Sequence, residues 1–347
     1  MKKLSIIILV LIIAVLGSCV DVLNLSTDRE ERLLVVEGYI STLPGPHTIK
    51  LQRSAKYGSV FEGFITNEED AQISVRDEQG RVTFLTEARA GEYQTPATFQ
   101  GQIGSTYTLQ IVTSDGTTYT SLPERIEAVV PLKSISTNFK STPSRGEEGT
   151  VEDVSGLEII AHFNDPEDAK NYYRWRNTGV YELNTEPSAF TDRFGRSAPK
   201  ECCDRCWISE SDESVHIFKD NISNGSEISQ PVAFILDDGI RLTARYFLRV
   251  EQHSVSESAY QFLNTIKGQL EIDGDIFDPP PAITRGNIIN LDNPDENVIG
   301  YFMASDISFQ EVFLTPADLE KLQPVVFIPD DCRLTDPTAT TARPVFW

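Results

Sequence analysis

The sequence predicts a mainly β protein, with an N-terminal immunoglobulin-like β-sandwich and a second, sandwich-like β-rich domain that carries one packed amphipathic helix. Short segments rich in β-branched and aromatic residues recur along the chain, separated by turn sequences such as Pro44-Gly45-Pro46 and Ser114-Asp115-Gly116. Short strands separated by turns are typical of a β-sandwich. Only one segment has helical periodicity, and 347 residues are enough for two domains.

The N-terminus has the order of a secretory signal peptide over residues 1–18. Two lysines precede an apolar run from Leu4 to Leu16, and small residues then lead into Cys19. The run is shorter than the ~20 apolar residues of a transmembrane helix. Leu16-Gly17-Ser18-Cys19 resembles a bacterial lipobox, in which the cysteine is acylated after cleavage. We therefore predict Cys19 as a lipidation site that carries several acyl chains, followed by a tether over residues 19–31. The alternative is an ordinary signal peptide with Cys19 as a free thiol.

Charge argues against nucleic acid as a partner. The whole chain has 30 basic and 52 acidic residues and a net charge of −22; removal of residues 1–18, which hold two lysines, makes it −24. An acidic surface repels phosphate backbones. We favour solubility at a crowded membrane surface over specific cation binding as the reason for this charge.

Residues 32–130 are predicted to form the first domain. Strand-like segments lie at 33–40, 48–52, 71–77, 82–86, 106–113 and 117–122. In one of them Tyr107, Leu109 and Ile111 alternate with other residues, which predicts one buried and one mostly exposed face.

Residues 131–347 are predicted to form the second domain. Its expected strands lie at 156–163, 172–183, 214–218, 241–253, 286–290 and 298–304. The polar stretch 141–153 has no apolar periodicity and is predicted to be a loop. The helix is expected near 255–271, because a capping-box pattern at Ser254 to Glu257 precedes apolar residues at helical spacing. One apolar face predicts that this helix packs on a sheet.

Apart from Cys19, the cysteines are Cys202, Cys203, Cys206 and Cys332. An exported protein meets an oxidising compartment, so we predict two disulfides, one of which joins the cluster at 202–206 to Cys332. A bond between the adjacent Cys202 and Cys203 is the least expected pairing, because its geometry is strained. Zinc would need four ligands, and we favour disulfides over a metal site.

No other motif predicts a cofactor or a catalytic residue. Glycine-serine nucleophile, zinc-protease and phosphate-loop motifs are absent from the sequence, so we do not predict an enzyme. The histidines have no ligand spacing; they are His47, His162, His216 and His253. Two acidic turns only loosely resemble calcium loops and are expected to be solvated; they hold Asp273, Asp275, Asp278, Asp292, Asp295 and Glu296.

Aromatic residues flank loops of the first domain and could contact a ligand, although ordinary core or rim packing explains them equally well. They are Tyr39, Tyr57, Phe61 and Phe64. The closing pair Phe346-Trp347 is expected to pack against the second domain, helped by the bridge to Cys332.

Several motifs together resemble a Bacteroidota outer-membrane lipoprotein family, the domain of unknown function 4249. They are residues 250–260, Phe277-Asp278-Pro279, Gly286-Asn287-Ile288 and residues 293–302, with the lipobox, the Cys-Cys-x-x-Cys-Trp cluster and the final residues 343–347. The resemblance covers essentially the whole mature chain. Members often end with two cysteines two residues apart before Gly-Gly, whereas this chain has only Cys332 there.

The resemblance implies no established reaction. It implies an outer-membrane lipoprotein, often encoded near TonB-dependent transporters that import nutrients. We therefore expect a lipid-anchored binding or accessory lipoprotein, on the periplasmic face or the cell surface, that works with such a transporter in nutrient capture or uptake. The alternatives are a structural or adhesive surface protein and a hydrolase whose site the motifs do not reveal.

Overall fold

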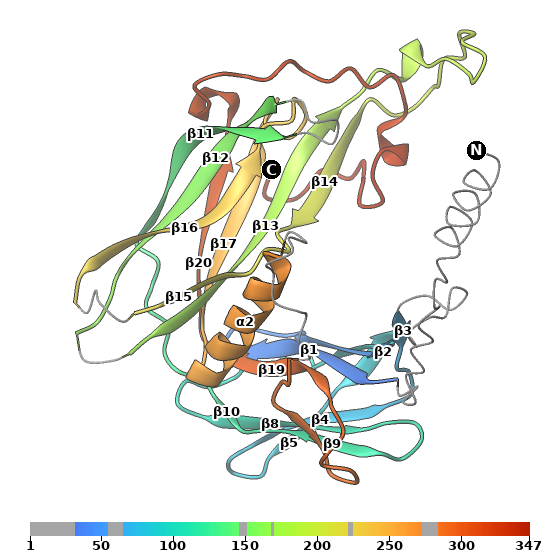
Figure 1. Cartoon of the computed structure of the whole chain (residues 1–347). Coiled ribbons are helices and arrows are strands. Elements are labelled where there is room, and N and C mark those ends of the chain that lie inside the picture. The colour runs from blue at the N-terminus through green and yellow to red at the C-terminus, as the bar shows by residue number, and fades with distance from the viewer. Residues whose placement is uncertain (1–31, 55–64, 146–150, 168–169, 221–224, 273–283) are drawn as a thin grey trace, which may run out of the picture.

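The computed structural model of the chain describes residues 32–54, 65–145, 151–167, 170–220, 225–272 and 284–347. These residues form two β-sandwiches and one α-helix, which confirms the predicted mainly β fold (Figure 1). The predicted signal peptide, Cys19 and the tether lie outside the described residues, as do Tyr57, Phe61, Phe64, Asp273, Asp275 and Asp278. Where the chain is described, it contains no helix of sufficient length and hydropathy to cross a membrane.

Two six-stranded sheets form the first sandwich. Sheet A has the order β19 (Ile299–Ser305), β1 (Leu34–Ser41), β2 (Thr48–Ser54), β7 (Glu92–Gln94) and β6 (Thr86–Arg89), with β3 (Ile65–Asn67) also on β2. Sheet B has the order β18 (Ile288–Asn290), β9 (Thr118–Ser121), β8 (Thr106–Val112), β4 (Gln72–Asp77) and β5 (Val82–Phe84), with β10 (Glu124–Arg125) also on β8.

Strand alternation places the core between these sheets. On β8 the predicted face of Tyr107, Leu109 and Ile111 is buried, and it packs with Val36 and Ile40 of β1. The opposite residues of β8 are half-buried, so the period-2 pattern of the sequence corresponds to one core-facing side.

The division of the chain at about residue 130 needs a correction. Although the prediction assigned residues 286–290 and 298–304 to the second domain, β18 pairs with β9 and β19 pairs in parallel with β1, so both complete the first sandwich. Phe302 and Ala304 of β19 enter the first core. Alternation marks a buried strand but does not identify its partner, which explains the error.

The second sandwich also consists of two sheets. Sheet C has the order β11 (Ser134–Arg145), β12 (Val151–Asn164) and β16 (Glu227–Leu236). Sheet D has the order β14 (Arg205–Ser211), β13 (Tyr172–Asn184), β17 (Tyr246–Ser254) and β20 (Ile307–Leu314), with β15 (His216–Lys219) also on β13. Trp175, Phe163 and Leu157 are fully buried between them.

The predicted loop at 141–153 is wrong for most of its length. Strands β11 and β12 pair as far as Arg145 and Val151. Strand β16 pairs only with residues 156–164 of β12, so the outer part of this hairpin is a two-stranded ribbon without a third strand. Backbone pairing of two strands does not require apolar alternation, which explains why the sequence pattern did not predict these strands. Residues 241–245 of another predicted strand are also not in a strand.

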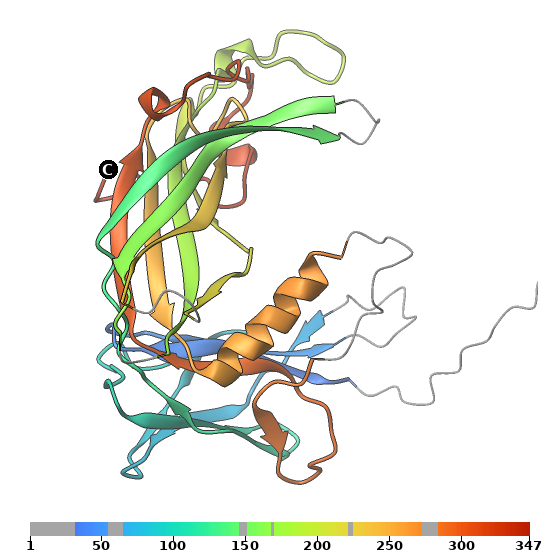
Figure 2. The ribbon, with the colours of Figure 1, turned by 60° about the vertical axis from the view of Figure 1, so that its left-hand side comes forward.

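Helix α2 (Glu257–Leu270) confirms the predicted amphipathic helix. Ser256 caps it by accepting a hydrogen bond from the Ala259 amide, at 3.1 Å. Figure 2 shows the helix in the angle between the two sandwiches. Its buried residues Ala259 and Leu263 form a small core with Tyr301 and Met303 of β19, on the side of sheet A opposite the first core. The helix thus fills part of the junction between the domains.

Three short 3₁₀-helices, η1 (Pro187–Ala189), η2 (Pro316–Asp318) and η3 (Cys332–Leu334), complete the described elements. Beyond η3 the C-terminal tail runs across the outer face of sheet D and pairs Thr340 with Trp207. Phe346 stacks on Phe247 with ring centroids 4.1 Å apart, as expected for a terminal aromatic pair packed on the second domain.

Candidate functional site

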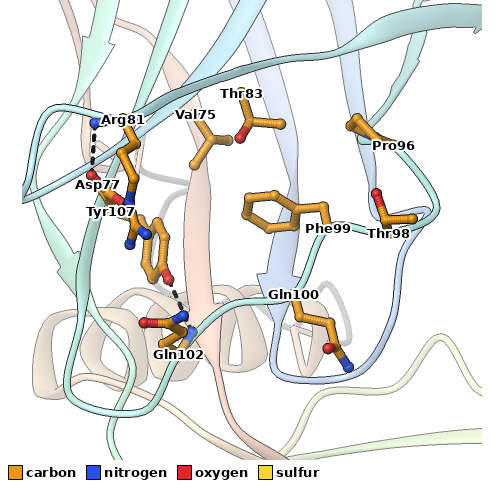
Figure 3. Close-up of a pocket in the computed structure, with 10 residues that line it drawn as sticks. All are labelled: Val75, Asp77, Arg81, Thr83, Pro96, Thr98, Phe99, Gln100, Gln102 and Tyr107. Carbon is orange, nitrogen blue, oxygen red and sulfur yellow. Dashed lines mark hydrogen bonds and ion pairs between the residues drawn. The ribbon is translucent and has the colours of Figure 1, made fainter.

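A cavity of about 360 Å³ lies at one end of the first sandwich (Figure 3). Phe99 and Tyr107 line it together with the amides of Gln100 and Gln102. Figure 3 shows these side chains opposite Val75 and Thr83, which come from the β4–β5 hairpin region. Aromatic faces with nearby amides can hold a polar ligand by stacking and hydrogen bonding.

Charge in this cavity is internally compensated. Asp77 accepts hydrogen bonds from the Arg81 guanidinium, at 2.5 Å, and from the backbone amides of Arg81 and Gln79. The hydroxyl of Tyr107 accepts a hydrogen bond from the backbone N–H of Gln102, at 2.9 Å. The aromatic rings and the side-chain amides therefore remain as uncharged lining groups of the cavity.

A larger hollow of about 710 Å³ lies where the two sandwiches meet, between the connecting segment 125–131 and the first turn of α2. Next to it, the buried carboxyl of Glu124 accepts hydrogen bonds from Tyr301, at 2.5 Å, and Ser256, at 2.8 Å. Burial raises the pKa of Glu124 despite these donors. Since its partners come from β19 and the cap of α2, Glu124 connects the elements of the junction.

A third cavity, of about 240 Å³, lies in the groove between sheet A and strand β13. Tyr39 of β1 and Arg176 of β13 line it, with the Arg176 guanidinium 5.2 Å from the centroid of the Tyr39 ring. The rings of His253 and His47 lie 5.1 Å and 6.5 Å from that of Tyr39. Tyr39 is therefore the one loop-flanking aromatic of the four predicted that the structure describes, and it lines a cavity between the domains.

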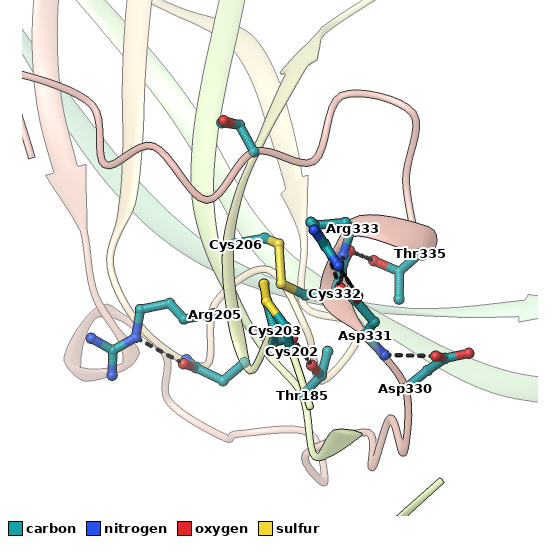
Figure 4. The surroundings of a disulfide bond; sticks show 12 residues. Thr185, Cys202, Cys203, Arg205, Cys206, Asp330, Asp331, Cys332, Arg333 and Thr335 are labelled. Atoms are coloured by element: carbon teal, nitrogen blue, oxygen red, sulfur yellow. Dashed lines mark hydrogen bonds and ion pairs between the residues drawn. A yellow bond between two sulfur atoms is a disulfide. The ribbon is translucent and has the colours of Figure 1, made fainter. Parts of the chain in front are cut away.

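The disulfides agree with the sequence in part (Figure 4). Cys206 is bonded to Cys332 with their Cα atoms 5.8 Å apart, which confirms the predicted link between the cluster and the C-terminal segment. The other bond joins Cys202 to Cys203, so the expectation against the adjacent pair is wrong. Cys206 points from β14 into the core beside Cys332, which leaves the remaining two cysteines to each other.

Backbone contacts reinforce this connection. The amide of Cys332 donates to the carbonyl of Cys203 at 3.0 Å, and the hydroxyl of Thr185 donates to the same carbonyl at 3.2 Å. The cysteine cluster therefore fixes the C-terminal segment to the edge of sheet D.

The other two histidines and the described acidic turn lie in separate places. His162 lies between the hydroxyls of Ser136 and Ser229, and His216 is 2.8 Å from Asp212. Asp292 and Glu296 accept hydrogen bonds within the first sandwich, from the Thr118 amide and from Asn290 and Tyr119. Asp295 has an exposed or half-exposed position in the same turn. Across the described ranges, no three histidine, cysteine or acidic side chains are grouped to hold a metal ion.

Two arginines in the groove were missed by the sequence reasoning. Arg174 and Arg176 alternate with buried residues on β13, and the only sequence signal is an Arg-x-Arg repeat inside a predicted strand. Such a repeat is equally typical of an exposed sheet face, so it does not predict a site without the strand's neighbours.

Comparison with known proteins identifies the family. No curated protein matches the chain significantly. The family model described as "Domain of unknown function (DUF4249)" matches residues 20–311. The match covers well over half of the chain and includes both sandwiches, as the motifs at 250–260 and 293–302 predict. The chain therefore belongs to the domain of unknown function 4249 family.

Proposed function

We propose that this protein is a lipid-anchored outer-membrane binding lipoprotein that works beside a TonB-dependent transporter in the capture or uptake of a nutrient. The observation that carries the binding role is the junction between the sandwiches. Strand β19 belongs to sheet A and runs directly into β20 of sheet D, while α2 packs against both sheets. Cavities of about 240 and 710 Å³ lie at this junction, and ligands preferentially bind at such domain interfaces.

The anchor rests on the sequence. Cys19 follows an apolar run and small residues in the order of a lipobox. Residues 19–33 would reach at most about 50 Å if extended, enough to place the first sandwich near a membrane partner without fixing its orientation. Several acyl chains on one residue make the attachment effectively permanent.

The anchor is tested by Cys19→Ala. The wild-type protein should fractionate with the outer membrane and carry acyl chains detectable by mass spectrometry. The variant should be recovered as a soluble, unlipidated chain, and its retention in the membrane would contradict the proposal.

The partner is tested by affinity isolation of the native lipoprotein from gently solubilised outer membranes, followed by mass spectrometry. A stoichiometric TonB-dependent transporter is the expected result, and it would also identify which nutrient to test. Recovery of the lipoprotein alone, while the neighbouring transporter is expressed, would favour a free-standing adhesive role. Cells that lack the protein should then lose attachment or envelope integrity with uptake unchanged.

A further inference from the structure

The groove between sheet A and β13 holds two arginines, Arg174 and Arg176, for which the described residues provide no direct ion pair. On β13 the side chains of Tyr173, Trp175 and Asn177 are buried in the second core. Because strand side chains alternate, Arg174 and Arg176 project from the opposite face, toward sheet A. Contacts of Arg174 with Met303 and of Arg176 with Tyr39 confirm this direction.

Within the described part of the chain neither arginine forms a direct ion pair, although Glu37 acts on Arg174 from a distance. Glu251, which is opposite Arg176 on β17, is paired with Arg249 and His253 instead. A nearby arginine on the same sheet, Arg249, lies 2.8 Å from the carboxylates of both Glu251 and Glu311. In contrast, Arg174 donates only to the sulfur of Met303, at 3.8 Å. Burial, together with the charge of Arg176, lowers the pKa of Arg174 to about 10. A partly buried guanidinium without a direct ion pair is costly, and the cost is unexpected in a chain with a net charge of −22.

The cavity in this groove has suitable donors. Arg176 and Lys50 line it, and so does the single acidic residue Glu37, which is paired opposite Lys50 across β1 and β2. The Lys50 ammonium is 3.7 Å from Glu92. Lys50 is thus paired with Glu92, and among the described residues Arg176 is the lining cation without an ion pair. This balance favours an anion of low charge over a phosphate dianion.

Arg176 is held in a position to recognise that anion. Its guanidinium lies over the Tyr39 ring, 5.2 Å from the centroid. Stacking on an aromatic face fixes the guanidinium plane and leaves its in-plane N–H groups free to bind two oxygens at once. His47 lines the same cavity; its side chain belongs to a residue only 7 % exposed, and Nε2 has no hydrogen-bond partner among the described residues.

We propose that this groove is a binding site for a small monocarboxylate, with Arg176 as its main ligand, Lys50 and Arg174 as supporting charges and Tyr39 as the platform that orients Arg176. A volume of about 240 Å³ admits a small organic acid such as a sugar acid. The inference does not depend on the membrane anchor or on a transporter, since it concerns binding by the isolated chain.

The test is titration calorimetry on the full mature chain in detergent at low ionic strength. The probes are acetate and D-galacturonate, with D-galactose as the uncharged counterpart. We expect saturable binding of at least one carboxylate, none of galactose, and an affinity that falls as salt is added. Absence of saturable binding of both carboxylates, or equal binding of galactose, would overturn the proposal.

Substitutions of Arg176 test whether the carboxylate binds in this groove. Arg176→Gln should weaken carboxylate binding at least 10-fold, and Arg176→Lys, which keeps the charge but loses the planar fork, should weaken it less. Arg76→Gln removes an exposed arginine from sheet B and should leave binding unchanged. Circular dichroism and thermal melting establish that each variant is folded. Equal affinity of folded Arg176→Gln and wild type would refute the assignment.

Discussion

Gly300 makes the close approach of β19 to β1 possible, and Gly300→Ala should therefore destabilise the junction. Gly300 has φ of +99° and is paired in parallel with Val36. A Cβ at this position would overlap the carbonyl oxygen of Val36 and would lie 2.8 Å from its carbonyl carbon. Both atoms belong to the backbone of a central strand, so neither a rotamer change nor a small side-chain shift can relieve the overlap.

The expected loss follows from two contributions. A residue with a Cβ in the left-handed region costs roughly 1–2 kcal/mol, and overpacking against a fixed neighbour costs about 1–3 kcal/mol. Gly300→Ala should therefore lower the free energy of unfolding by roughly 2–5 kcal/mol. The magnitude is a large part of the stability of an ordinary domain.

Two matched substitutions separate these contributions. Gly116 has φ of +89° with nothing within 4 Å of an added Cβ, so Gly116→Ala measures the backbone cost alone. Gly268 is inside α2 and also has nothing within 4 Å. Gly268→Ala should stabilise the protein, by up to about 1 kcal/mol.

Urea unfolding followed by far-UV circular dichroism and by tryptophan fluorescence provides the assay. All three tryptophans, Trp175, Trp207 and Trp347, belong to the second sandwich or to the tail that packs on it. Loss of the β1–β19 contact should therefore shift the circular-dichroism transition more than the fluorescence transition. The reasoning is refuted if Gly300→Ala is as stable as Gly116→Ala.

Three further predictions concern other parts of the molecule. Cys332→Ser removes a disulfide between residues 126 apart and should lower the free energy of unfolding by up to about 5 kcal/mol. Mass mapping under non-reducing conditions should give Cys206–Cys332 and Cys202–Cys203. A bond between Cys332 and Cys202 would contradict the assignment. Burial and the neighbouring Asp220 raise the pKa of Asp165 from 3.8 to about 6 in the folded protein. The folded protein therefore holds this proton more tightly than the unfolded chain, and the contribution of Asp165 to stability falls as the pH rises from about 4 to 6. Asp165→Asn should then be more stable than the wild type at pH 7, by roughly 1–3 kcal/mol. In urea unfolding experiments this difference in the free energy of unfolding should shrink below about pH 4. A difference that does not depend on pH would disprove the role of Asp165. Trp347→Ala removes ring contacts with Trp207 and Phe313 and should cost about 1–2 kcal/mol, measured by thermal melting, whereas Val345→Ala at a fully exposed position should be neutral.

The sequence by itself determined the features that depend on local chemistry. Alternation at Tyr107, Leu109 and Ile111 predicted a core-facing strand, because every second side chain of a strand points to the same face. The capping pattern and spacing predicted α2, because its hydrogen bonds lie within one segment. Motifs also predicted the family, and four cysteines in a chain predicted to be exported indicated the bridge to Cys332.

The candidate site could not be predicted in the same way. Its side chains come from the neighbouring strands β1 and β2 and from β13, which lies more than 100 residues later in the chain. Arg174 and Arg176 gain their significance only from the absence of a direct ion pair in the folded structure. The arrangement of these side chains depends on how the two sandwiches pack against each other, and no local sequence pattern in the three strands predicts it.

Only the tertiary structure decided which strands are partners. Residues 288–305 carry an ordinary strand pattern, yet they close the first sandwich after nearly the whole second sandwich has intervened in the chain. The strands at 141–145 and 151–153 were missed for the opposite reason, because backbone pairing leaves no side-chain pattern in the sequence. The pattern of side chains in a sequence indicates which residues are buried, whereas the pairing of strands is set by backbone hydrogen bonds and by the packing of the complete chain.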